Sequence, residues 1–250
     1  MKREFYREYA EIEDRHWWFL GRRRIFTRLL DAHLNGQEAR RLVLDVGCGT
    51  GTMLLQLRRY GCTFGVELDH EAAGYCKDRG LDTVTQAMAG HLPFADDTFG
   101  LITALDVIEH IDDDRGALRE AMRVLRPGGH LLVSVPAFRF LWGRQDDINL
   151  HKRRYVAGEL RERLTAAGYD VVRLTYINAA LFPPIAAFRL MRRLLPKPES
   201  LRSDFTVPAP GPLNSLLAWV FGAERIAISR FDMPFGVSIL ALARKPDASR

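Results

Sequence analysis

Apolar residues in the first half of the chain occur in short runs separated by stretches of helical period. The short runs predict strands that end near Asp45, Glu67, Gln86, Leu105 and Pro136. The stretches 71–79 and 115–125 place apolar residues three or four positions apart and predict amphipathic helices. We expect the second of these helices to end at Pro127–Gly129, where the fifth strand opens. Strands that alternate with helices predict a parallel sheet covered on both faces.

The second half of the chain departs from this alternation. A helix is predicted over 157–167, a sixth strand over 169–176 and a seventh over 234–245. A hairpin between the last two strands needs only 2–5 residues, but roughly 60 lie between them. Helical patterns over 182–196 and 213–229 occupy this insert, and two more helices are expected within 1–34. We therefore expect an N-terminal helical arm (1–40), a core (41–177 and 234–250) and a helical insert (178–233).

The segment 42–54, LVLDVGCGTGTML, predicts a buried strand, a tight turn and the start of a helix. Gly47, Gly49 and Gly51 recur at every second position after Asp45. Glycine adopts φ > 0 and lets a ligand approach bare backbone, and a helix start offers unpaired N–H groups to an anion. Such a turn suits a nucleotide-like cofactor. A second acid, Glu67, ends the next predicted strand.

Two motifs carry a resemblance to a known family. The pattern D-x-G-x-G-x-G over 45–51 resembles motif I of class I S-adenosylmethionine (SAM) dependent methyltransferases. The segment 92–111, LPFADDTFGLITALDVIEHI, resembles the methyltransferase type 11 group. The dinucleotide fingerprint G-x-G-x-x-G of an oxidoreductase is the alternative, but Thr52 stands at its third glycine. The resemblance covers 42–136. It implies a Rossmann-like, seven-stranded, mostly parallel α/β sheet with helices on both faces, and methyl transfer from SAM that leaves S-adenosylhomocysteine.

The resemblance also implies which residues bind the cofactor beyond the carboxyl ends of the strands. Glu67 is expected to accept hydrogen bonds from both ribose hydroxyls. Met88 stands where the family often has an aspartate for the adenine amino group, so adenine is expected to contact Met88 and the backbone near Ala89. The expected cofactor-binding residues are Asp45, Gly47, Cys48, Gly49, Gly51, Glu67, Leu68, Met88, Ala89 and Asp106.

The arm carries the sequence HWWFLGRRRIF at 16–26. Many bacterial methyltransferases of this type begin with a similar segment, which implies a lid over the cofactor. In that role the rings of Trp17 and Trp18 would exclude water, and an arginine among Arg22–Arg24 would hold the SAM carboxylate. The alternative is that the two tryptophans fix the arm to the core.

Candidate catalytic residues follow the fourth and fifth strands. His110 and His151 are expected near the transferred methyl group, where a base is needed if the acceptor is a hydroxyl. Glu109 and Asp146 are further candidates at the same edge. A capping or packing role is the alternative for His110, and a surface loop is the alternative for His151. The seven histidines are scattered without metal-ligand spacing, so the sequence predicts no metal site.

The insert is expected to build the acceptor pocket. Its apolar residues include Leu181, Phe182, Ile185, Phe188, Trp219 and Phe221, and its rim arginines are Arg189, Arg192 and Arg193. Such a wall favours a small or lipid-like acceptor with an apolar body. The basic amphipathic segment 182–195 is compatible with peripheral membrane contact or with docking on its own domain. The alternative is that the insert only extends the core and that the acceptor binds under the arm.

Amino-acid composition narrows the range of possible functions and partners only slightly. The 250 residues are 47% hydrophobic and 27% charged, as in globular proteins, with a net charge of +5. This charge leaves an RNA methyltransferase open, but no RNA-binding module is recognisable, so nucleic acid is not the expected partner. A non-catalytic SAM-binding protein is a further alternative. Three cysteines without disulfide or zinc spacing predict reduced thiols and a cytoplasmic protein. These patterns do not encode the oligomeric state.

Overall fold

The computed structural model describes residues 6–34, 41–193 and 210–247. Within them, seven strands form one sheet in the order β3-β2-β1-β4-β5-β7-β6. The strands are β1 (Leu42–Val46), β2 (Cys62–Glu67), β3 (Val84–Gln86), β4 (Phe99–Leu105), β5 (Leu125–Pro136), β6 (Asp170–Ile177) and β7 (Ser238–Arg244). Strands β1 to β5 pair in parallel, whereas β7 runs antiparallel to β5 and β6. The predicted seven-stranded, mostly parallel sheet is confirmed.

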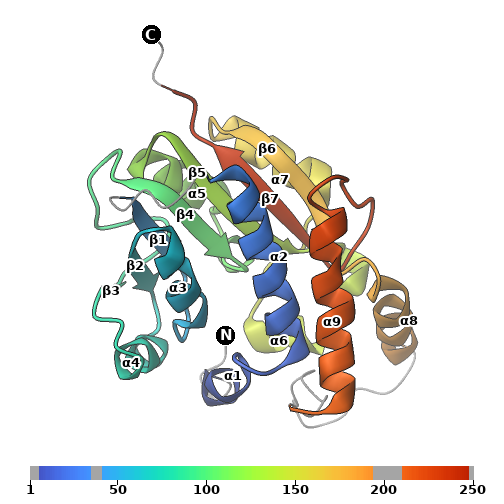
Figure 1. Ribbon diagram of the computed structural model, residues 1–250. Coiled ribbons are helices and arrows are strands. Elements are labelled where there is room, and N and C mark those ends of the chain that lie inside the picture. The colour runs from blue at the N-terminus through green and yellow to red at the C-terminus, as the bar shows by residue number, and fades with distance from the viewer. Residues whose placement is uncertain (1–5, 35–40, 194–209, 248–250) are drawn as a thin grey trace.

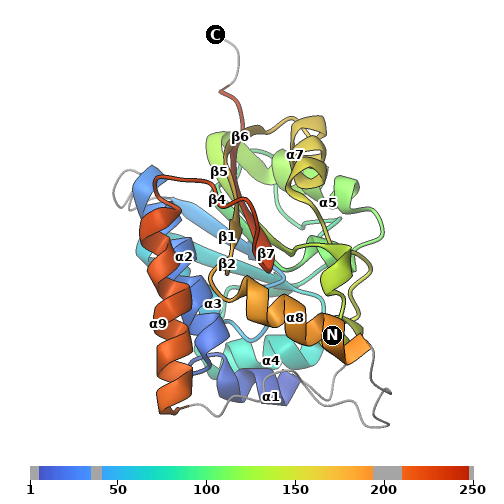
Figure 2. The ribbon, with the colours of Figure 1, turned by 90° about the vertical axis from the view of Figure 1, so that its right-hand side faces the viewer.

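Helices cover both faces of this sheet, as predicted. They are α1 (Tyr6–Ile12), α2 (Trp17–His33), α3 (Thr52–Leu57), α4 (His70–Asp78), α5 (Asp114–Val124), α6 (Arg144–Asn149), α7 (Ala157–Ala166), α8 (Phe182–Arg193) and α9 (Pro212–Ala227). Figures 1 and 2 show α2, α3 and α9 on one face and α5 and α7 on the other. Both helical patterns of the insert are present, although residues 194–196 of the first lie outside the described residues.

The central strands are apolar on both sides because both faces are covered. Neighbouring residues of a strand point to opposite faces. Leu101 and Leu132 therefore pack in the cluster beneath α2 and α9, whereas Ile102 and Leu131 pack in the cluster beneath α5 and α7. Continuous apolar runs are what such doubly covered strands require.

The start of β5 corrects one prediction. We expected a helix to residue 125 and then a turn at Pro127–Gly129, but α5 ends at Val124 and β5 begins at Leu125. Phe99 pairs with Leu125, whereas Leu101 pairs with His130, so the register shifts between the two strands. The proline and glycines interrupt the ladder locally as a bulge, and pairing with the neighbouring strands keeps the segment in the sheet.

The arm and the insert pack against each other through α2 and α9, which lie side by side in Figure 1. A Cβ added to Gly21 would lie 2.3 Å from a ring carbon of Phe221. A Cβ added to Gly222 would lie 2.8 Å from the Arg24 side chain. Gly21 is therefore needed for the two helices to approach this closely, whereas at Gly222 the flexible end of Arg24 could move aside.

Two buried polar side chains of α9 complete this contact. Asn214 Oδ1 accepts a hydrogen bond from the backbone N–H of Trp17 at 2.7 Å, and its amide donates to an arm carbonyl at 2.9 Å. Glu224 accepts from the backbone N–H groups of Asn178 and Ala180 at 2.7 and 2.9 Å. Helix α9 is thus bonded to the arm near its start and to the segment after β6 near its end. None of the described helices combines the length and apolar character needed to cross a bilayer.

We predict that Asn214→Ala lowers the free energy of unfolding by about 1–3 kcal/mol, because it leaves a buried backbone N–H without an acceptor. Denaturant unfolding measures this loss. The exposed neighbour Ser215→Ala on the same helix serves as the control and should change stability by less than about 0.5 kcal/mol. Equal stability of the two variants would show that the bond between α9 and the arm contributes nothing.

Candidate active site

A large cavity of about 1540 Å³ opens at the carboxyl ends of β1, β2 and β4. Its walls come from the arm, the glycine turn between β1 and α3, the segments that follow β2, β3 and β4, the α6 region and α8. Ligands of open α/β sheets bind at this edge. The volume exceeds the ~300–1,000 Å³ typical of one small-ligand pocket, so the cavity has room for two ligands at once.

The three glycines of the turn have different roles. All have positive φ, at +68° for Gly47, +55° for Gly49 and +87° for Gly51. A Cβ on Gly47 would lie 2.6 Å from Val107, and one on Gly51 would lie 2.4 Å from Leu81, so packing requires both to be glycine. A Cβ on Gly49 meets nothing within 4 Å. Of the three, Gly49 therefore presents bare backbone toward open space.

Glu67, at the end of β2, holds this turn. Its Oε2 accepts a hydrogen bond from the N–H of Gly49 at 2.9 Å. Its Oε1 accepts from the N–H groups of Leu68 and Asp69 at 2.8 and 2.9 Å. Three backbone donors fix the carboxylate at the cavity wall. They occupy both lone-pair sites of Oε1 and one of Oε2, so Oε2 keeps capacity for one further donor.

The arm reaches the glycine turn directly. Glu13 accepts a hydrogen bond from the Thr50 hydroxyl, and the Tyr9 hydroxyl donates to Asn149 of α6 at 3.1 Å. Burial raises the pKa of the Glu13 carboxyl above its usual value. Burial, with a smaller contribution from neighbouring acids, also raises the pKa of Asp45 to about 7, although Thr103 donates a hydrogen bond to it. These acids line the cavity together with Glu67 and Asp106.

Asp106 and Arg22 form an ion pair in the cavity wall. Arg22 Nη1 lies 2.7 Å from Asp106 Oδ2, and Ser134 accepts from Arg22 and donates to Asp106. The guanidinium also lies over the rings of Trp18 and Phe26, at 5.7 and 5.2 Å from their centroids. Arg22 is therefore held in place before any ligand binds, and its charge is already shared with a carboxylate.

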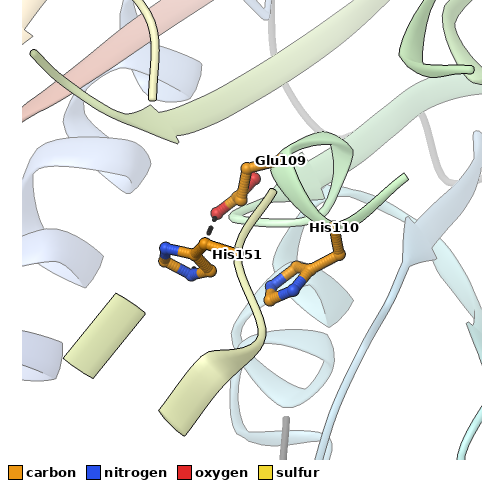
Figure 3. A group of neighbouring side chains, drawn as sticks. All are labelled: Glu109, His110 and His151. Atoms are coloured by element: carbon orange, nitrogen blue, oxygen red, sulfur yellow. Dashed lines mark ion pairs between the residues drawn. The ribbon is translucent and has the colours of Figure 1, made fainter. Parts of the chain in front are cut away.

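A second group of side chains lies on the other side of the cavity, around η3 (Ile108–His110) and the loop after α6 (Figure 3). His151 Nδ1 lies 2.8 Å from Asp146 Oδ1, and His151 Nε2 lies 3.8 Å from Glu109 Oε1. The rings of His110 and His151 meet edge to face, with 4.8 Å between their centroids. Arg154 donates to both oxygens of Asp146 at 2.8 and 3.0 Å.

Burial and neighbouring charges set the protonation of this group. Burial, with a smaller contribution from Asp106, raises the pKa of Glu109 well above its usual value. Burial and the adjacent His151 lower the pKa of His110 to about 4. Burial alone would raise the pKa of Asp146, but hydrogen bonds from His151 and Arg154 hold it below the usual range. His110 is therefore neutral and Asp146 ionised near neutral pH.

Comparison with known proteins identifies the family. A model of the methyltransferase domain matches residues 44–133. The chain is 31% identical to the probable SAM-dependent methyltransferase Rv3030 of Mycobacterium tuberculosis over 257 aligned positions, which cover 96% of this chain and 88% of the relative. It is 32% identical over 167 positions to a probable SAM-dependent methyltransferase of Mycolicibacterium smegmatis, across 64% of this chain and 62% of the relative. The chain belongs to the SAM-dependent methyltransferases.

The fold is also that of known methyltransferases. The methyltransferase superposes with a TM-score of 0.62 on a chain from the solved complex between the Haloferax volcanii Trm112 methyltransferase activator and a putative methyltransferase. The two sequences are 19% identical, and the match covers 100% of each chain. This likeness shows the Rossmann-like methyltransferase fold. The resemblance to the type 11 methyltransferases, the enzyme class and the cofactor expected from the sequence are thereby confirmed.

The cavity fits SAM by the chemistry of its lining. SAM carries a sulfonium and an ammonium group, and the acidic residues that line this cavity include Glu13, Asp45, Glu67 and Asp106. The open face of Gly49 lets such a ligand approach the backbone. Leu68 and Met88 are 60% and 63% exposed at the cavity wall and offer apolar surface to a purine ring.

Nearly all the residues predicted to bind the cofactor line this one cavity. The exception is Gly51, which packs against Leu81 beneath the turn. The Cys48 side chain is buried in a small cluster with Cys76 and Leu81. Both predicted histidines also line the cavity. The assignment of these residues to binding or catalysis remains a prediction.

The sequence did not identify the residues whose hydrogen bonds hold the cavity-lining side chains in place. Glu13, Thr50, Ser134 and Arg154 make the hydrogen bonds described above, but the sequence assigned none of them a role, and Thr50 stands at a variable position of the glycine motif. For Glu13 the one available signal is its position three residues before the His-Trp-Trp segment. The partners lie far apart in sequence, so spacing alone could not pair them.

The structure corrects the predicted acceptor wall. Ile185 and Phe188 of α8 line the cavity, together with Arg189 and Arg192. Trp219 of α9 is instead 65% exposed and does not line the cavity. Phe221 is buried against Trp17 and Trp18 of the arm, with ring centroids 6.1 and 5.4 Å apart. The period of α9 predicted an apolar face that includes Leu213 and Leu216, but these two are exposed, and the side of α9 that packs on α2 carries Phe221 and Gly222. The side chain of Arg193 lies outside the described part of the chain.

We predict that SAM or S-adenosylhomocysteine slows hydrogen exchange of residues 6–26, because this arm forms one wall of the cavity. Amide exchange followed by mass spectrometry measures the change. Helix α7, which contributes nothing to the cavity wall, is the internal control and should exchange at an unchanged rate. If calorimetry confirms binding while the arm exchanges as before, the arm is a static wall and not a lid.

Proposed function

We propose that this methyltransferase transfers a methyl group from SAM to a small or lipid-like acceptor, and that both bind in the cavity described above. The observation that carries the proposal is the open face of Gly49 beside the Glu67 carboxylate, at one end of a cavity large enough for two ligands. Glu67 would accept a hydrogen bond from one ribose hydroxyl at the lone-pair site that Oε2 keeps, and from the second hydroxyl only in place of one of its backbone donors. Leu68 and Met88 would pack on adenine, and Arg22 would bind the carboxylate of the amino-acid end.

When bound, SAM supplies an activated methyl group on a positively charged sulfur. The contribution of the protein is to align the acceptor with that carbon and to exclude water. Trp17 and Trp18 in the arm and Phe188 in α8 form the apolar parts of the wall that serve this exclusion. Arg22 and Asp106 are already paired, so ordering them costs little when the ligand enters.

His151 and His110 are the bases available to an acceptor that must lose a proton. The hydrogen bond from His151 Nδ1 to Asp146 fixes the tautomer that leaves Nε2 as the acceptor nitrogen. His110 is kept neutral by burial, since its pKa is lowered to about 4, and its ring adjoins that of His151. The oriented Nε2 lone pair makes His151 the better-placed proton acceptor, whereas the lowered pKa makes His110 a weak base.

The proposed class of acceptor rests on α8. Ile185 and Phe188 give the cavity an apolar wall, and Arg192 lies over the ring of Phe188 at 5.6 Å from its centroid. An acceptor with an apolar body and an anionic group fits these side chains. Farther along α8, Leu190 and Met191 are 46% and 57% exposed. This apolar surface supports the proposal of peripheral contact with a membrane, from which a lipid-like acceptor would enter.

The cofactor site is tested by Gly49→Ala with Gly80→Ala as its matched control. Both glycines have positive φ, +55° and +70°, and a Cβ on either meets nothing within 4 Å. Both variants therefore bear similar backbone strain, but Gly80 does not line the cavity. We expect Gly49→Ala to weaken SAM binding at least about tenfold, equivalent to about 1.4 kcal/mol, and Gly80→Ala to leave it unchanged. Equal calorimetric affinities would place SAM elsewhere.

The acceptor wall is tested by Phe188→Asp with Met191→Asp on the same helix as the control. Methyl-labelled SAM, incubated with polar and lipid extracts, first identifies the labelled acceptor. We expect Phe188→Asp to raise the KM for that acceptor about tenfold, with SAM affinity retained, because it places a charge in the apolar wall. Met191 lies outside the cavity, so its variant should keep the parent KM when the acceptor is supplied in detergent and no membrane contact is involved. Unchanged kinetics in both variants would show that α8 is structural.

A further inference from the structure

Glu109, His110 and His151 come together at one point of the cavity wall, although they are separated in sequence. One ligand-type atom from each lies within 4.8 Å of the other two (Figure 3). We propose that these three side chains bind a divalent transition-metal cation such as Zn²⁺. The absence of metal-ligand spacing in the sequence does not exclude this site, because the loop after α6 brings His151 back to η3.

The first argument is that Glu109 and His151 both have buried acceptor atoms without a hydrogen-bond donor. Glu109 is fully buried, and neither of its carboxylate oxygens has a hydrogen-bond partner. His151 Nε2 is also buried without a partner, and it lies 3.8 Å from Glu109 Oε1. Among the described residues, no lysine or arginine forms an ion pair with Glu109. Buried polar groups are normally satisfied, so two that face each other across this distance point to a cation between them.

The second argument is the orientation of His151. Arg154 donates to both oxygens of Asp146, and the Asp146 carboxyl holds the Nδ1 side of the imidazole at 2.8 Å. The proton therefore sits on Nδ1, and the lone pair of Nε2 faces Glu109. A histidine that binds a metal usually donates its other N–H to a carboxylate in this way, and that carboxylate sets the tautomer and the ring orientation.

The donor set indicates which cations fit. Two imidazoles and one carboxylate are typical of catalytic zinc and of other first-row divalent ions, which keep a further position open. Calcium and magnesium prefer oxygen ligands throughout. Bonds of about 2.0–2.2 Å would bring the three ligand atoms to about 3.4 Å from one another, so binding would draw the side chains together.

The ion would also change the chemistry of the acceptor, a consequence that rests on the proposed function. His110 and His151 line the cavity, so the open position would face the acceptor. A metal-bound hydroxyl ionises more readily. Its proton would pass to bulk water, the oxygen would bond to the methyl carbon, and the carbon–sulfur bond would break with its electron pair left on sulfur. His151 would then act as a ligand, and the cation would replace it as the activating group.

The test is direct binding of metal to the full chain after treatment with a chelator and desalting. Calorimetric titration with Zn²⁺, and the visible absorption of added Co²⁺, should both report one ion per chain. We expect Glu109→Gln and His151→Asn each to weaken binding at least tenfold, and Asp146→Asn to weaken it about 10–100-fold through its effect on His151. The control His33→Asn lies outside this cavity and should bind as the parent does.

X-ray absorption of the zinc-loaded parent protein provides evidence that does not depend on how the variants fold. Two imidazole nitrogens and one carboxylate in the coordination shell would support the site. Failure of the parent to bind Zn²⁺ or Co²⁺, or full retention of binding in Glu109→Gln, would overturn it. SAM affinity is measured on the same samples. Normal SAM binding without metal binding would reject this inference and leave the proposed cofactor site intact, whereas loss of SAM binding by the parent would reject the proposed function.

Discussion

The buried carboxylate of Asp146 is the interaction on which the acceptor side of the cavity depends. It accepts hydrogen bonds from the backbone of Gly143, from His151 and twice from Arg154, and an Arg189 nitrogen lies 3.5 Å away. An ionised group with no exposure is tolerated only when donors surround it. The chain from α6 to α7 must therefore adopt the conformation that supplies these donors. That conformation carries His151 toward Glu109, and Arg189 connects the same centre to α8.

The other side of the cavity depends on contacts between the arm and the insert. Helix α2 contributes Arg22 to the cavity wall and, one turn farther along, Phe26 to the core. Its start is held by Asn214 of α9. Helices α2 and α9 are thus parts of a single layer, and residues distant in sequence determine where Arg22 lies. The cavity is shaped as much by these two peripheral segments as by the sheet.

The strand–turn–helix around Gly49 and the succession of strands along the chain were predictable, because glycine spacing and apolar runs depend on the conformation of the nearby backbone. These sequence patterns gave wrong predictions where contacts with residues distant in sequence determine the local conformation or the packing. Pro127–Gly129 predicted a turn, but pairing with the neighbouring strands retains the segment as a bulge in β5. The period of α9 predicted its apolar face only in part, because Phe221 packs on α2 whereas Leu213 and Leu216 are exposed. Glu109 and His151 likewise give no sign of each other in the sequence.

The charges in the cavity wall explain why a cationic ligand suits it. Burial raises the pKa values of Asp45, to about 7, and of Glu13, so these acids are not all ionised near neutral pH when no counter-charge is present. A sulfonium or ammonium group close to them favours the ionised forms, and its binding is therefore linked to the release of protons. Methyl transfer turns the sulfonium into a neutral sulfide and removes that counter-charge. At the site proposed for SAM, the same acids would then favour exchange of the product, which has lost the sulfonium charge, for a fresh cation.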